Sequence, residues 1–209
     1  EDLSGITLAE LREDFAQKRY KMTNWLQKCT ASTLENTSNT PELQTLIDNM
    51  LETMKNADGV GLAAPQIGES IRLFVVDVRH YEEDYQEKTG EPFPDAWKEC
   101  MVFINPEIIA ESDEESEFEE GCLSVPDIHE MVTRPSKISL QYLDRHFTPQ
   151  KMEVDKLMAR VIQHEHDHLD GILFLDHMSA FKRRMLQRKL RDIQRGVLET
   201  KYPMAKLSA

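Results

Sequence analysis

The chain has 209 residues, of which 40% are hydrophobic and 30% charged, and its formal net charge at pH 7 is −13. This is the composition of a globular protein large enough for one sizeable core. The acidic balance argues against a generally nucleic-acid-binding surface, and we expect no membrane association, because no apolar run is long enough to cross a bilayer. Cys29, Cys100 and Cys122 have no framework spacing, and the N-terminus lacks the layout of a signal peptide, so reduced thiols in a cytoplasmic protein are expected.

The N-terminal segment, residues 1–40, is predicted to contain a helix followed by a loop. Apolar side chains recur at helical intervals within residues 7–29, and residues 30–40 are rich in Ser, Thr and Asn. The sequence of this segment assigns it no role. We expect the remaining residues, 41–209, to form a single domain.

A helix is predicted at the start of that domain. Thr40 followed by Pro41 has the pattern of an N-cap and a first-turn proline. Apolar residues from Leu43 to Met54 recur with helical spacing, and the Asp-Gly pair at 58–59 would end the helix.

Three β-rich runs follow, at residues 71–78, 101–109 and 138–142, and they predict strands. The polar stretch 81–99 between the first two is predicted to be a surface excursion. Residues 111–120 contain seven acidic residues and are predicted to be a solvated loop or a hairpin.

Another helix is predicted from Val154 onward, where apolar residues again recur with helical spacing. A strand-like run at 172–175 follows it. Residues 181–195 form a predicted C-terminal helix with seven basic residues and one acidic residue. The side chains expected to pack this helix against the protein are Phe181, Met185, Leu186, Leu190 and Ile193. The order of elements indicates an α+β protein, with small antiparallel sheets packed around the helix that begins at Val154.

That helix carries the pattern His164-Glu165-x-x-His168. Two histidines four positions apart lie on one helix face and can bind the same metal ion. At about 100° per residue, Glu165 falls near the middle of the apolar stripe and the two histidines fall along one edge. A carboxylate aimed at a core is costly unless a cation with a water compensates its burial. The pattern therefore predicts a hydrolytic metal site.

A catalytic ion of the zinc type needs a third protein ligand. In the metzincin pattern this would be a histidine at position 174, but the residue is Phe174. Glu199 or Asp176 could serve as a later carboxylate ligand, although neither has a helical context that recommends it. Cys122 is the better candidate, because it lies between a glycine and a strand-like run, where the backbone can approach another group closely. The alternative is a small buried hydrophobic residue, as lone cysteines commonly are.

Residues 59–68 form a small-residue loop between the first predicted helix of the domain and the first predicted strand. The loop lacks the Gly-Lys-Ser/Thr ending of a phosphate loop, and it follows a helix, whereas a dinucleotide fingerprint follows a strand. It is either a tight connection or a loop that delivers the amide side chain of Gln66.

Three stretches in this order closely resemble the signature motifs of the peptide deformylase family. They are Gly-Val-Gly-Leu-Ala-Ala-Pro-Gln at 59–66, Glu-Gly-Cys-Leu-Ser at 120–124 and Gln-His-Glu-x-Asp-His at 163–168. The resemblance covers residues 41–203 and identifies residues 41–209 as a catalytic domain. It implies removal of the N-formyl group from the formyl-methionine of nascent polypeptides in bacteria, with release of formate.

The resemblance also implies the cofactor and the catalytic groups. One divalent metal ion is expected, Fe(II) first, with Zn, Ni or Co as substitutes. The implied metal ligands are Cys122, His164 and His168. Glu165 would take the proton of the attacking water and return it to the leaving amine, while the Gln66 amide and the backbone N–H of Leu123 would stabilise the oxyanion.

The expected contacts with the substrate follow from the same resemblance. The implied substrate-binding residues are Val60, Gly61, Glu120, Gly121 and Leu123. The methionine side chain would lie near Leu157 and Val161. The basic helix at 181–195 would either pack with its charges in solvent or contact the ribosome near the exit tunnel, as the resemblance allows.

Two rival hypotheses belong to other functional classes. A general HExxH zinc metallopeptidase would cleave unformylated internal peptide bonds and would not need Cys122. A non-catalytic relative would keep the fold as a binding module, but it would be free to lose Glu165 and Gln66, both of which are present.

Overall fold

The computed structural model describes residues 39–195, 197 and 202. The helix predicted within residues 7–29, nearly all of the predicted loop at 30–40, and Glu199 lie outside these residues. The helices are α2 (Pro41–Asn56), α3 (Glu82–Thr89), α4 (Lys156–Leu169) and α5 (Ala180–Gln194), and the short 3-10 helices are η1 (Ala64–Ile67), η2 (Arg79–Tyr81), η3 (Asp95–Trp97) and η4 (Phe174–His177). The strands are β1 (Gly61–Ala63), β2 (Leu73–Val76), β3 (Met101–Glu111), β4 (Glu115–Cys122), β5 (Val125–Pro135), β6 (Lys137–Leu143) and β7 (Pro149–Asp155).

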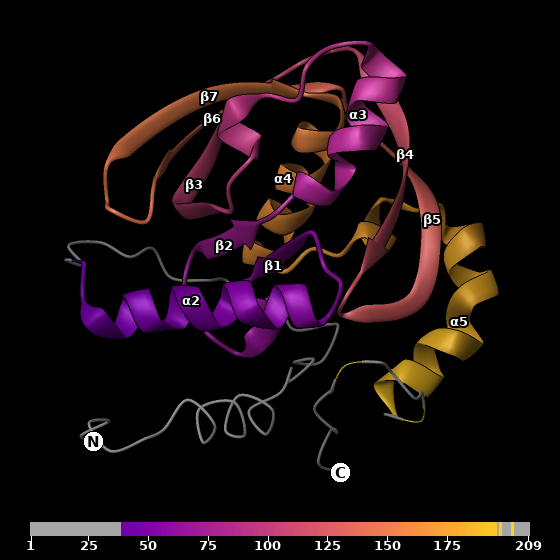
Figure 1. The fold of residues 1–209 in the computed structure, drawn as a ribbon. Helices are drawn as coiled ribbons and strands as arrows, with labels where there is room; N and C mark the ends of the chain where they lie inside the picture. The colour runs from indigo at the N-terminus through magenta and orange to yellow at the C-terminus, as the bar shows by residue number, and fades with distance from the viewer. Residues whose placement is uncertain (1–38, 196, 198–201, 203–209) are drawn as a thin grey trace.

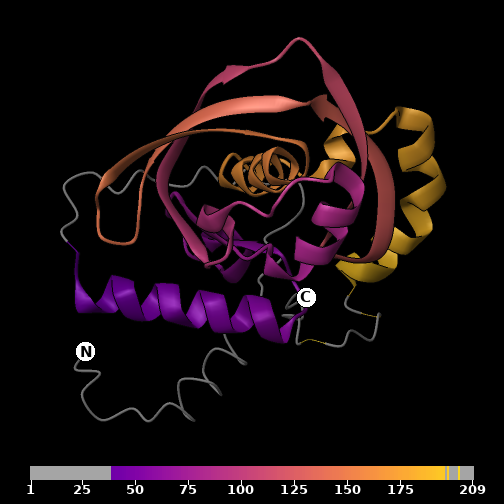
Figure 2. The same ribbon diagram turned by 45° about the horizontal axis from the view of Figure 1, so that its top comes forward.

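Antiparallel strands form two sheets around α4. One is five-stranded in the order β1-β2-β3-β6-β7, and the other is the hairpin of β4 and β5. Helix α4 lies in the middle of the molecule against β1, β2, β6 and β7, α2 runs along β1 and β2, and α5 lies beside β5 (Figures 1 and 2). This arrangement confirms the predicted α+β fold with small antiparallel sheets around the motif helix.

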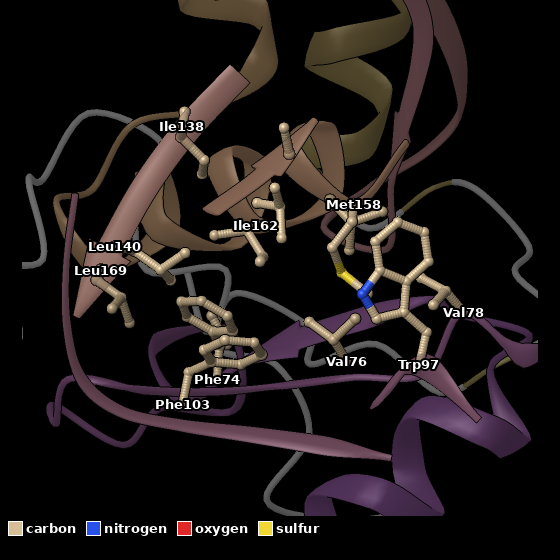
Figure 3. Close-up of a cluster of buried hydrophobic side chains, with 14 of the residues drawn as sticks. Phe74, Val76, Val78, Trp97, Phe103, Ile138, Leu140, Met158, Ile162 and Leu169 are labelled. Atoms are coloured by element: carbon tan, nitrogen blue, oxygen red, sulfur yellow. The ribbon is translucent and has the colours of Figure 1, made fainter. Parts of the chain in front are cut away.

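The core that holds α4 in place is built from the apolar faces of the five-stranded sheet and of the helix. Phe74 of β2 stacks on Phe103 of β3, with ring centroids 4.7 Å apart, and both belong to one buried cluster with Met158 and Ile162 of α4 (Figure 3). Burial of such side chains is worth roughly 1.5–3 kcal/mol each. The helix that carries His164 and His168 is therefore fixed by packing along its opposite face.

The helix predicted at the start of the domain and the three predicted strands are confirmed. The Thr40 hydroxyl accepts a hydrogen bond from the Leu43 N–H at 3.3 Å, and α2 begins at Pro41 and ends just before the Asp-Gly pair. The β-rich runs correspond to β2, β3 and β6. Of the two alternatives for residues 111–120, the hairpin is correct, since β4 begins at Glu115.

Three expectations need correction. Residues 81–99 are not only a surface excursion, because they contain α3 and bury Phe93 and Trp97 in the core. The strand predicted at 172–175 is wrong: the Leu173 N–H donates to the Asp176 carboxylate at 3.0 Å, which caps the turn of η4 and lets it bury Phe174. The predicted packing of α5 is only partly correct.

Helix α5 forms where it was predicted but packs with only part of its apolar residues. Leu186, Leu190 and Ile193 join a cluster with β5 and η4, and Ile193 is 4% exposed. Phe181 and Met185 are 73% and 72% exposed, because they lie on the face of the helix turned away from β5. No helix in the described part of the chain is long and apolar enough to cross a membrane.

Candidate metal centre

Cys122, His164 and His168 converge at one point between the hairpin and α4. One potential ligand atom from each residue lies within 4.8 Å of the others. The Cys122 Sγ is 3.2 Å from the His168 Nε2, and the two imidazole rings are perpendicular, with centroids 4.9 Å apart. A thiolate and two imidazoles suit a divalent ion of borderline softness such as iron or zinc. Cys122 and Asp176 were both candidates for the third metal ligand. The structure places Cys122 beside the two histidines, whereas the Asp176 carboxylate caps η4.

The hairpin presents the thiol of Cys122 to the histidines. Cys122 is the last residue of β4 and pairs with Val125, so Leu123 and Ser124 form a two-residue turn, and the register shifts between Gly121 and Cys122. Burial alone would raise the pKa of the Cys122 thiol, but the charge on His168 and hydrogen bonds with both imidazoles hold it well below its usual range. The thiolate form, which is the metal ligand, is thereby favoured.

Glu120 fixes the orientation of His164. Its Oε2 lies 2.9 Å from the His164 Nδ1, and its carboxylate accepts hydrogen bonds from Arg134 at 2.8 and 3.0 Å and from Arg160 at 2.8 Å. Burial opposes the charge, but His164 and Arg134 hold the pKa of Glu120 well below its usual range. A carboxylate at Nδ1 keeps the proton on that nitrogen and leaves Nε2 of His164 available for a metal ion.

Sequence reasoning missed the two arginines of this network. Arg160 lies four residues before His164 on α4 and is 5% exposed, and Arg134 comes from β5 and is 4% exposed. An arginine inside the apolar spacing of a helix is a signal for a buried ion pair, since such a charge is rarely buried without a partner. The arginine in β5 gave no comparable signal.

Glu165 is buried and has one oxygen without a partner. The side chain is 4% exposed, and no hydrogen-bond partner for its Oε2 exists among the described residues. Burial raises the pKa of Glu165 to about 7, against the opposing effect of the two imidazoles. A Cβ at Gly61 would overlap the Glu165 carboxylate, so only glycine fits there. A buried carboxylate with one unpartnered oxygen, beside three groups able to bind a metal, is what a site for an ion and a water requires.

The loop at 59–68 does deliver the Gln66 amide to the site. The Gln66 Oε1 accepts a hydrogen bond from the Ala63 N–H at 2.7 Å, which fixes which end of the amide is the donor. The Gln66 Nε2 donates to the Ser124 hydroxyl at 3.1 Å and lies 3.8 Å from the Cys122 Sγ. A fixed N–H donor thus points toward the place where the ligands converge.

A pocket of about 710 Å³ opens onto this centre. All of the residues predicted to bind substrate line it, namely Val60, Gly61, Glu120, Gly121 and Leu123. Leu157 and Val161 also line the pocket, as expected for an apolar subsite, and so does Tyr202 from the C-terminal tail. The pocket therefore joins an apolar wall to the Glu165 carboxylate.

The fold and the site together define the class: an α+β protein with the His-Glu-x-x-His helix of a metallohydrolase, whose histidines and Cys122 could hold a metal ion at the base of a pocket. The sequence model of the polypeptide deformylase family matches residues 20–184. Over 166 aligned residues the chain is 52% identical to the peptide deformylase of Salinibacter ruber. The aligned region covers 79% of this chain and 83% of that protein. The chain belongs to the peptide deformylase family.

Solved structures agree with this assignment. A crystal structure of a peptide deformylase from Legionella pneumophila superposes with a TM-score of 0.69 at 41% identity, covering 86% of this chain and 95% of that one. A peptide deformylase from Synechococcus elongatus gives a TM-score of 0.67 at 34% identity, with 82% and 84% covered. The chain is thus an enzyme that removes the N-formyl group from nascent peptides, and the general metallopeptidase hypothesis is not favoured.

Proposed function

We propose that Cys122, His164 and His168 hold a single divalent metal ion for deformylation, Fe(II) first, with Zn, Ni or Co as substitutes. The observation that carries this proposal is their convergence within 4.8 Å beside the unpartnered, buried oxygen of Glu165. When bound, such an ion supplies Lewis-acid activation of a water and of the substrate carbonyl. We further propose that residues 41–209 make up the single catalytic domain.

Glu165 handles the proton of the reaction. Its carboxylate takes a proton from the attacking water and returns it to the amine that leaves as the C–N bond breaks. A pKa near neutrality suits both tasks, and burial provides it. The products are formate and a peptide with a free methionine N-terminus.

Gln66 and Leu123 stabilise the negative charge that develops on the formyl oxygen when the water oxygen bonds to the formyl carbon. The Gln66 Nε2 is held in place by its contacts with Ala63 and Ser124, and the Leu123 N–H follows Cys122 directly. One such fixed donor is worth about 3–4 kcal/mol of the barrier.

Substrate binding follows from the lining of the pocket. Val60, Gly61, Glu120, Gly121 and Leu123 contact the formyl-methionyl end of the peptide. Because Glu120 is 4% exposed and its carboxylate is engaged by two arginines and His164, its contribution comes from the backbone. The methionine side chain lies against Leu157 and Val161, where apolar contact is available.

The test is formate release from formyl-Met-Ala-Ser by protein purified without oxygen and loaded with Fe(II) or Ni(II), with the acetylated peptide as control. Release from the formyl peptide alone is expected. Glu165→Gln should keep the metal and lose roughly 10²- to 10⁴-fold in kcat, the range for a general base. Cys122→Ala should lose the metal. A Cys122→Ala protein that binds the ion as tightly as the parent would contradict the ligand assignment.

We also propose that α5 contacts ribosomal RNA, and that the enzyme works in the cytoplasm. The helix carries basic residues and an exposed apolar pair, Phe181 and Met185, on a protein whose net charge is −13. Arg184→Glu with Arg188→Glu should weaken binding to isolated ribosomes and reduce its salt dependence, since each phosphate contact contributes to that slope. Unchanged affinity and salt slope would remove the contact.

A further inference from the structure

We propose that Tyr202, in the C-terminal tail, is a positioning residue of the active site. It holds the turn that follows the proposed metal-binding thiol and carries the proposed oxyanion donor, and its ring forms part of the substrate pocket. The proposal rests on the roles assigned above to Cys122, Leu123 and Gln66.

The hydroxyl of Tyr202 donates a hydrogen bond to the backbone carbonyl of Leu123 at 2.8 Å. Leu123 and Ser124 are the two residues of the turn between β4 and β5. The peptide between these two residues lies outside the strand ladder, whose last pair is Cys122 with Val125, so the ladder itself does not fix it. Tyr202, 79 residues away in sequence, supplies the missing partner.

Three groups of the proposed site lie in this turn or next to it. Cys122 lies immediately before it, the Leu123 N–H is the proposed oxyanion donor, and the Ser124 hydroxyl accepts the hydrogen bond that orients Gln66. The Leu123 side chain is also confined, because it packs directly on Gly59. Gln66 and Tyr202 therefore hold the turn from two directions, each by one hydrogen bond.

The ring of Tyr202 has a second role in the pocket. It is partly buried against the cluster that includes Met54 and Leu62, and it lines the same pocket as Glu165 and Cys122. A rigid aromatic wall at this place limits how the peptide lies over the turn. Loss of the hydroxyl and loss of the ring should thus have different kinetic effects.

The experiment compares Tyr202→Phe and Tyr202→Leu in the Ni(II)-loaded chain of 209 residues. For formyl-Met-Ala-Ser, Tyr202→Phe should lower kcat about three- to tenfold with KM changed less than about twofold, the effect of one lost hydrogen bond on a transition-state donor. Tyr202→Leu should lower kcat similarly and also raise KM. Both should retain the metal.

A readout independent of turnover is the absorption spectrum of the Co(II)-loaded protein, which reports the geometry at the Cys122 thiolate. Tyr202→Phe should shift the thiolate band. Tyr85→Phe is the matched control, since its hydroxyl makes an exposed, long contact of 3.4 Å with Glu91 in the segment 81–99. It should change neither the spectrum nor kcat.

The outcomes separate this inference from the proposed function. If the parent protein releases formate and Tyr202→Phe matches it in kcat and in the Co(II) spectrum, Tyr202 has no positioning role. A variant that loses activity only in proportion to lost metal or lost folded protein would also overturn the proposal, because Tyr202 would then be structural. No formate from the metal-loaded parent would instead overturn the residue roles on which the inference depends.

Discussion

Lys156 is the first residue of α4, the helix that carries the two histidines. Its backbone has a left-handed conformation that residues other than glycine rarely adopt. Its φ is 50°, in the left-handed region, and its N–H donates to the Ser136 carbonyl at 3.1 Å. A residue with a Cβ loses about 1–2 kcal/mol in this region, whereas glycine adopts it freely. The side chain is exposed and lies outside the pocket.

Lys156→Gly should therefore raise the free energy of unfolding by about 1 kcal/mol, less than the full strain because glycine also gains entropy when unfolded. Urea denaturation measures it, and kcat should stay unchanged. Lys151→Gly is the control: it is exposed in β7, where glycine should destabilise by about 0.5–1 kcal/mol. If both variants lost stability, strain at Lys156 would be disproved.

The individual residues of the site differ in how far the sequence could identify them. His164, Glu165 and His168 follow from local helix geometry, because a period of 3.6 residues fixes which side chains share a face. Their burial confirms the position of Glu165 in the apolar stripe. Arg134 and Tyr202 act through contacts that span 14 residues or more along the chain, and no local pattern encodes such contacts.

At the level of elements, helices were predicted better than strands. The amphipathic spacing of α2, α4 and α5 extends over several turns, so it is recognisable without knowledge of neighbours. Strands β5 and β7 were missed because each is stabilised by pairing with a partner and keeps many polar, exposed side chains. The three-residue β1 reads as loop for the same reason.

Asp77 follows β2 directly and fixes both ends of the segment at 79–99, through hydrogen bonds with Arg79 and with Cys100. The Asp77 carboxylate accepts hydrogen bonds from the Arg79 guanidinium at 2.6 and 2.8 Å and from the Cys100 thiol at 3.2 Å. The hydrogen bonds from Arg79 hold the pKa of Asp77 well below its usual range, although burial opposes this. Because the folded-state pKa is the lower one, the stabilisation is present above the unfolded-state pKa of about 3.9 and is lost as the pH falls below it.

Asp77→Asn should thus lower the free energy of unfolding by about 1 kcal/mol at pH 7, a modest value because Arg79 is partly exposed. The difference from the parent protein should stay constant down to about pH 5 and shrink below about pH 4. Urea titrations at several pH values measure it. Asp95→Asn is the control: Lys98, at 2.7 Å, also lowers the pKa of Asp95, but the Asp95 side chain is 95% exposed, so solvent screening should make the same trend much smaller. A difference that grew at low pH would contradict the sign of the shift.

On the scale of the whole molecule, the candidate metal centre joins two separately packed parts. His164 and His168 belong to α4, which is buried against the five-stranded sheet, whereas Cys122 belongs to the hairpin, whose own cluster includes η4 and α5. An ion bound to all three would connect the two clusters. Its binding free energy would then add directly to the stability of the folded chain, since the unfolded chain has no assembled site.

Loading with Ni(II) at about 100 times the Kd should stabilise the fold by about 2.7 kcal/mol and raise the Tm by several degrees. Cys122→Ser should lose most of this metal-dependent rise, because it removes the ligand contributed by the hairpin. Cys100→Ser is the matched control: its thiol binds Asp77 instead, so its Tm without metal should fall slightly while the rise on loading is retained. Equal rises in the two cysteine variants would mean that the ion is held by α4 alone, and that the hairpin and the helix are joined by packing and the Glu120 network rather than by the metal.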